Sequence, residues 1–175
     1  MEPVLFVYTA ELNPRVEYAF SLFFESLITT PYKLTKDIAE YKTYSGPKLN
    51  YSAQQIEKDK LFFQSHGLLT QTGIVLQEIT VSEWNGLKIF YQVKDSVLPF
   101  DIFAAGFYLV SRYEEYLNSA PDEHHRFKSG DSLAFKNNFL NMPIVNLWAL
   151  ELKKLLLKEY PQLTIKENTY KFIPT

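Results

Sequence analysis

The sequence contains no cysteine, and this absence excludes disulfide scaffolds, thiol chemistry and zinc sites built on thiolates. A chain without cysteine fits a reducing compartment, so we expect a cytoplasmic protein. The longest apolar run, residues 97–110, contains Asp101 and is shorter than the roughly 18 residues that a membrane-spanning helix needs. The amino terminus has neither a basic segment nor a small-residue cleavage site, so we expect no signal peptide and no membrane span.

An excess of positive charge is also missing. The formal net charge is -2, and no stretch of the sequence clusters lysine and arginine. Because nucleic-acid binding depends on a basic surface, we expect no DNA or RNA partner. The G-x-G-x-x-G loop, the Walker A loop and the G-x-S-x-G elbow are absent, so the common nucleotide-binding and serine-hydrolase classes are not indicated.

Aromatic residues, in contrast, are abundant. The 175 residues include 14 Phe and 12 Tyr, and aromatic side chains bury large areas when a chain folds. This length suits one domain with a sizeable core. We therefore expect a single compact domain over residues 1–175.

Local patterns predict both strands and helices. Residues 4–8 form a short β-branched and aromatic run, which is typical of a central buried strand. Asn13 and Pro14 are the residues that open a helix, and Met142-Pro143 opens another with an apolar stripe. Further short strands are predicted at residues 32–34, 49–52, 61–64 and 165–173.

The dipeptide Asn85-Gly86 predicts a two-residue hairpin turn, with strand-like runs at residues 74–76, 79–81 and 87–93 around it. A polar stretch over residues 119–138 is expected to form a long exposed loop. Together these elements predict an α/β fold: a mixed β-sheet with a β-hairpin and about three packed helices.

The most informative stretch runs from Pro99 to Tyr116, where a nearly all-apolar helix meets a charged and aromatic end. Asp101 is the only charged residue in the apolar part, so its carboxylate needs hydrogen-bond donors. Capping the first turn of this helix supplies such donors. A catalytic role for Asp101 is the alternative.

The charged end of this helix has two interpretations. Arg112 and Glu115 are three residues apart and can pair on a solvated face. They can also form the rim of a pocket walled by Tyr108, Tyr113 and Tyr116.

Histidines offer two further candidates. Residues 122–125 hold Asp, Glu and two His, but adjacent side chains point in different directions and the H-x-x-x-H spacing is absent, so we expect no metal site. His66 follows a predicted strand, where it can serve acid-base chemistry or form a structural hydrogen bond.

Several segments in order resemble a bacterial family: residues 65–69, the long block 98–116, residues 122–127 and residues 142–148. The sequence is similar to the uncharacterised amino-terminal domain that precedes the catalytic domain of polysaccharide deacetylases. The resemblance covers most of the chain, and its most specific part is the block from Phe100-Asp101 to Glu114-Glu115-Tyr116.

This resemblance implies a non-catalytic accessory domain that packs on a deacetylase domain following it in the same polypeptide, or that contributes to binding of a surface polysaccharide. A divalent metal is expected only in that catalytic domain, so no catalytic or metal-binding residue is assigned to this chain. The expected binding residues are His66, Asp101, Tyr108, Arg112, Tyr113 and Glu115.

One alternative stays open at this point. The chain could be a small hydrolytic enzyme in its own right, with Asp101, His66, Arg112 and Glu115 gathered around one cleft. A convergent pocket with strongly perturbed carboxylates would favour that function.

Overall fold

A computed structural model describes residues 3–117 and 127–166 of the chain. Four short parallel strands form its main sheet, in the spatial order β2-β1-β3-β4. The strand β1 pairs with β2 along one edge and with β3 along the other, so it lies inside the sheet. The strands are β1 (Leu5–Thr9), β2 (Tyr32–Thr35), β3 (Lys48–Ser52) and β4 (Phe62–Gln64).

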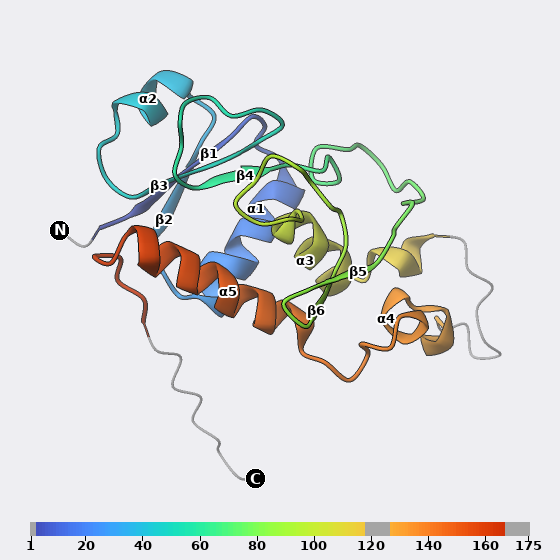
Figure 1. Cartoon of the computed structure of the whole chain (residues 1–175). Coiled ribbons are helices and arrows are strands. Elements are labelled where there is room, and N and C mark those ends of the chain that lie inside the picture. The colour runs from blue at the N-terminus through green and yellow to red at the C-terminus, as the bar shows by residue number, and fades with distance from the viewer. Residues whose placement is uncertain (1–2, 118–126, 167–175) are drawn as a thin grey trace, which may run out of the picture.

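Helices flank this sheet, and a separate antiparallel pair lies beside it (Figure 1). The pair consists of β5 (Ser82–Trp84) and β6 (Leu87–Ile89). The α-helices are α1 (Pro14–Ser21), α2 (Ile38–Thr43), α3 (Ile102–Val110), α4 (Leu133–Lys136) and α5 (Ile144–Glu159). A π-helical turn over Leu22–Leu27 continues α1, and 3-10 turns occupy Tyr113–Tyr116 and Ser129–Asp131.

The predicted α/β fold is confirmed, and so are most of its elements. Asn13 caps α1 by accepting hydrogen bonds from the N–H groups of Arg15 and Val16. Asn85 and Gly86 both have positive φ, as the predicted hairpin turn between β5 and β6 requires. The hairpin forms its own two-stranded sheet, so the strands do not join into one mixed sheet.

Some predicted elements are wrong. Residues 74–76 and 79–81 form no strand, and of the run 87–93 only Leu87–Ile89 is a strand. The stretch 119–138 contains a 3-10 turn and α4 where we expected only loop. The central helix ends at Val110, earlier than expected, because Arg112 adopts a left-handed conformation (φ 53°) that an α-helix cannot accommodate. Residues 167–173 of the last predicted strand lie outside the described residues, and residues 165–166 form no strand.

The helix α2, which the strand patterns did not predict, has a capping signal in the sequence. Asp37 caps this helix by accepting hydrogen bonds from the N–H groups of Ala39 and Glu40. An acidic cap followed three residues later by Glu is the pattern that opens many helices.

One face of the sheet carries the main core. Leu5 and Val7 of β1 point into it, and α1, α3 and α5 supply the opposing side chains. Phe103 of α3 is central to the packing, because its ring contacts those of Phe20, Phe23, Phe24, Tyr51 and Phe63. This packing explains why α3 is buried along most of its length.

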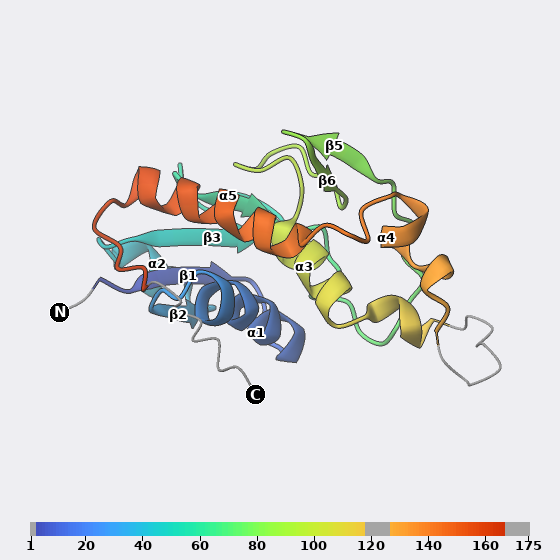
Figure 2. The same cartoon turned by 90° about the horizontal axis from the view of Figure 1, so that it is seen from below.

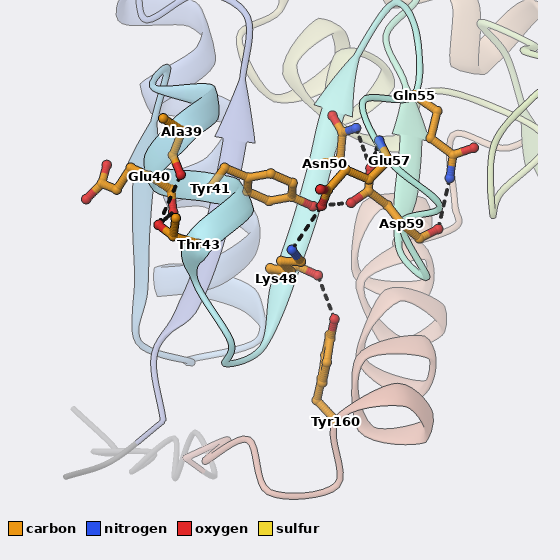
Figure 3. Close-up of polar contacts among 10 residues, drawn as sticks. All are labelled: Ala39, Glu40, Tyr41, Thr43, Lys48, Asn50, Gln55, Glu57, Asp59 and Tyr160. Atoms are coloured by element: carbon orange, nitrogen blue, oxygen red, sulfur yellow. Dashed lines mark hydrogen bonds and ion pairs between the residues drawn. The ribbon is translucent and has the colours of Figure 1, made fainter.

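The other face of the sheet is smaller and more polar (Figure 3). Tyr41 of α2 is fully buried there, and its hydroxyl donates to Asp59 at 2.7 Å. Asp59 also accepts from the side-chain amide of Asn50 at 2.8 Å, while the Lys48 ammonium lies 4.8 Å from the Tyr41 ring centre. These contacts attach α2 and the β3–β4 connection to the sheet.

The carboxyl edge of the parallel sheet, where α/β folds often bind ligands, is covered by the chain itself. Asn13 donates to the carbonyl of Leu69 at 2.9 Å, and Arg15 donates to the carbonyls of Leu68 and Gly73. Leu68 and Leu69 are buried. The segment after β4 therefore closes the amino end of α1.

Candidate functional site

Asp101 lies at the junction of three elements. Its carboxylate accepts hydrogen bonds from the Tyr51 hydroxyl of β3 at 2.8 Å, the backbone N–H of His66 at 2.7 Å and the backbone N–H of Ala104 in α3 at 3.0 Å. The last contact is the predicted helix cap, which the structure confirms. Both carboxylate oxygens thus already hold partners from the protein.

Burial dominates the electrostatics of this carboxyl group. The residue is only 2% exposed, and loss of hydration raises the pKa of Asp101 to about 6 from its usual 3.8. The hydrogen bonds from Ala104, His66 and Tyr51 favour the charged form and offset part of that effect. Burial together with the neighbouring carboxylate raises the pKa of the Tyr51 hydroxyl as well.

His66 contacts Asp101 through its backbone N–H group. Its imidazole ring is stacked on the ring of Tyr91, with centroids 4.3 Å apart. Burial lowers the pKa of the His66 imidazole. Tyr91 has a positive φ of 60°, which is strained for a bulky residue, and among the described residues its buried hydroxyl has no hydrogen-bond partner.

Arg112 and Glu115 lie at the other end of α3. They form the predicted ion pair across one helical turn, and the Arg112 side chain is largely exposed. Because an α-helix rises 1.5 Å per residue, the eight steps from Ile102 to Val110 of α3 span about 12 Å, and Arg112 lies beyond that end. The structure therefore brings His66 to Asp101 but places Arg112 and Glu115 at the far end of the helix.

Contrary to the expectation from the sequence, Tyr108, Tyr113 and Tyr116 do not wall one pocket. Tyr113 is buried, and its hydroxyl is bonded to the backbone of Val75. Tyr108 packs against Tyr91 and Tyr113 and lines a neighbouring hollow, where burial raises the pKa of its hydroxyl. Tyr116 is 66% exposed. The left-handed turn at Arg112 sends these side chains in different directions.

A different hollow, of about 420 Å³, lies between the end of α3, α4 and the start of α5. Its rim includes Arg112, Glu114 and Glu115. Its walls are mainly apolar: Leu109, Val110, Phe139, Leu140, Met142 and Val145.

Two further hollows adjoin this first one. The second, of about 460 Å³, shares Glu114 and Phe127 with it and extends to Leu76, Ile79 and Tyr108. The third, of about 260 Å³, shares Leu140 and reaches Phe135. We call the three adjoining hollows the corner groove. It surrounds α4, at the opposite end of the molecule from α2 (Figure 1 and Figure 2).

The corner groove presents an unusual number of exposed apolar side chains. Leu76 is 74% exposed, and Phe135, Leu140 and Met142 are also exposed. Clustered exposure of this kind is typical of interaction surfaces and of ligand-binding grooves. Sequence reasoning identified Arg112 and Glu115 at this groove but missed its apolar walls, because their exposure depends on tertiary packing.

Residues 3–117 and 127–166 contain no group of three histidine or acidic side chains that could hold a metal ion. The acidic and histidine residues 122–125 lie outside the described residues. Within the same described ranges, no helix is long and apolar enough to cross a membrane.

Comparison with known proteins gives one match. The model of a family of unknown function, DUF7033, matches residues 5–161. No curated protein and no solved structure matches the chain. None of these comparisons connects it to polysaccharide deacetylases. Since the family model covers most of its length, the chain belongs to the DUF7033 family.

Proposed function

We propose that this chain is a non-catalytic accessory domain of a polysaccharide deacetylase and that it packs on the catalytic domain through the corner groove. The observation that carries the proposal is the set of three adjoining hollows with exposed apolar walls. Aliphatic and aromatic side chains rimmed by charges such as Arg112 are typical of protein interfaces. The resemblance of the block 98–116 to domains that precede deacetylases supplies the identity of the partner.

The arrangement of the polar candidates supports an accessory role over catalysis by this chain. The carboxylate of Asp101 is enclosed by three donors of the protein itself. Arg112 and Glu115 pair with each other at the opposite end of α3. A stand-alone hydrolase using these residues with His66 would need them around one cleft.

Glycan binding is a second candidate role. Phe135 and Tyr116 have exposed rings, and aromatic rings can stack on the apolar faces of sugars. In either role, the divalent metal of the deacetylation reaction would belong to the catalytic domain.

The proposal is tested by deacetylase assays on acetylated oligosaccharides with added divalent metal. The 175-residue chain is compared with a polypeptide in which it is joined to the deacetylase domain. We expect turnover only in the joined form. Turnover by the 175-residue chain alone would contradict the accessory role and direct attention to His66 and Asp101.

A matched pair of variants tests the surface. Leu140 lies in the corner groove and is 52% exposed, whereas Leu150 on α5 lies outside the residues that line it and is 53% exposed. Leu140→Asp should weaken binding of a separately produced deacetylase domain at least about tenfold, since it buries a charge in an apolar contact. Leu150→Asp should leave that binding unchanged. Calorimetric titration with the deacetylase domain measures the packing role, and titration with an oligosaccharide measures glycan binding.

A further inference from the structure

Glu114 lies in the wall that two hollows of the corner groove share. It belongs to the 3-10 turn after α3 and lines both the first and the second hollow, with its side chain half-buried. The backbone N–H of Leu133, the first residue of α4, donates to its oxygen Oε2 at 2.9 Å. Within residues 3–117 and 127–166, no donor contacts the other carboxylate oxygen, Oε1. One oxygen of a carboxylate between two largely apolar hollows is therefore available to a partner group.

The cations of the groove itself do not neutralise this carboxylate. Arg112 forms its ion pair with Glu115 instead. Lys136 lines the second hollow and is exposed, but in the described parts of the chain it forms no ion pair with Glu114. Burial raises the pKa of the Glu114 carboxyl group, and the N–H of Leu133 and the charge of Lys136 offset only part of that effect. The hydration that Glu114 loses is thus not replaced by a cation of the same chain.

The walls of the second hollow suit a long basic side chain. Leu76, Ile79 and Leu133 supply apolar surface along which the methylene stem of such a side chain can lie. The ring of Tyr108 also lines this hollow, and guanidinium groups pack favourably on aromatic rings. Apolar walls for the stem and a carboxylate for the head are the two features that bind arginine or lysine at a protein interface.

We propose that the corner groove receives a basic side chain of its protein partner, arginine or lysine, and that the cationic head of this side chain binds Oε1 of Glu114. The inference rests on the proposed function for the identity of the partner, which is the deacetylase domain that packs on this groove. It states what the packing requires of that domain: a basic residue flanked by apolar residues that fill the first hollow. Opposite charges across the contact also fix the orientation of the two domains.

Two substitutions with opposite expected effects test the charge of the partner. Glu114→Gln removes the charge but keeps an oxygen for the N–H of Leu133, and it should weaken binding of a separately produced deacetylase domain about tenfold. Lys136→Gln removes a like charge from the same hollow, so it should tighten that binding about twofold. Glu151→Gln is the control for net charge, because Glu151 lies on α5 outside the residues that line the groove, and it should leave binding unchanged.

A peptide titration tests the same site without the deacetylase domain. The probe is the tripeptide acetyl-Leu-Arg-Leu-amide, and its matched control has glutamine in place of arginine. Binding is followed through the amide NMR signal of Leu133, whose N–H is bonded to Glu114. The arginine peptide should bind at least about fivefold more tightly than the glutamine peptide, and Glu114→Gln should abolish this preference.

The outcomes separate this inference from the accessory role. If the deacetylase domain binds and neither Glu114→Gln nor Lys136→Gln changes its affinity, the inference is wrong while the accessory role stands. Effects of opposite sign would show an acidic partner and would also overturn the inference. If the domain does not bind, the peptides decide: a preference for arginine that Glu114→Gln removes would support the cation site and contradict only the accessory role. Equal or absent binding of the two peptides would then overturn both.

Discussion

The hydroxyl group of Tyr113 is bonded to both backbone polar groups of Val75. It accepts from the N–H at 2.9 Å and donates to the carbonyl at 3.2 Å. Tyr113 itself is buried beneath the Arg15 guanidinium, which lies 5.5 Å from its ring centre. One phenol therefore fixes an exposed loop residue that is 38 positions away in the sequence.

Tyr113→Phe should detach Val75 with little change in the core. Loss of two hydrogen bonds from a buried hydroxyl is expected to lower the free energy of unfolding by about 1 to 2 kcal/mol. The amide of Val75 should lose protection from hydrogen exchange more than the amides of α5. Tyr116→Phe is the control, because the exposed Tyr116 should tolerate the same change within about 0.5 kcal/mol.

The stability of the protein should depend on the ionisation of Asp101. The pKa of this group is higher in the folded chain, about 6, than its usual 3.8. Its contribution to stability is therefore present below pH 3.8 and is lost as the pH rises through 6. Urea unfolding at pH 4.5 and pH 7 measures the free energy of unfolding of the unmodified chain and of Asp101→Asn. Between the two pH values the free energy of unfolding of the unmodified chain should fall by about 2 kcal/mol relative to that of the variant.

His66 contributes to the pH dependence of stability with the opposite sign to Asp101. Burial lowers the pKa of its imidazole, so the folded chain disfavours the charged form and stability from this group rises with pH. Repeating the comparison in a His66→Ala background removes this opposing contribution. If the stability difference between Asp and Asn at position 101 stayed constant from pH 4.5 to 7, the raised pKa of Asp101 would be refuted.

Gly106 allows close packing of α3 on the turn that follows α1. A methyl group at this position would lie 2.6 Å from Cε2 of Phe23. Alanine is normally the better helix former, but this overlap should dominate and make Gly106→Ala destabilising by about 1 to 3 kcal/mol. Gly130→Ala is the control, since its nearest neighbour would be 4.0 Å away, and thermal unfolding of both variants measures the difference.

The contact between Tyr41 and Asp59 should stabilise the second face of the sheet. A double-mutant cycle with Tyr41→Phe and Asp59→Asn should give a coupling energy of about 1 to 2 kcal/mol, because a buried phenol donates to a carboxylate there. The hydrogen bond from Ser21 to Glu25 is exposed, so the same cycle at that pair should give a coupling near zero. Equal coupling at the two pairs would contradict a structural role for the Tyr41–Asp59 contact.

Several features could be predicted because they depend on neighbours in the chain. Asn13 before Pro14 and Asp101 before an apolar run act as helix caps by bonding N–H groups two or three residues away. Asn85-Gly86 tolerates the positive φ angles of a tight hairpin. The ion pair of Arg112 with Glu115 was predicted from their spacing of three residues, and it forms across the 3-10 turn over Tyr113–Tyr116.

The candidate site was only partly predictable. Asp101 and His66 were both chosen from the sequence, but their contact runs through the backbone of His66, which no residue pattern indicates. The sequence did not reveal the corner groove as an apolar surface, because Leu140 and Met142 are residue types that also form protein cores. Residue type alone does not distinguish a buried leucine from an exposed one.

The sequence by itself determined the local elements of this protein: which residues begin a helix, where the hairpin turns and which strand is buried most deeply. Tertiary structure decided the rest. The hydrogen bonds that Asp101 accepts from Tyr51 and His66, and those between Val75 and Tyr113, join residues from separate segments of the chain. Local preferences act over a few residues, whereas long-range contacts depend on the packing of the whole chain.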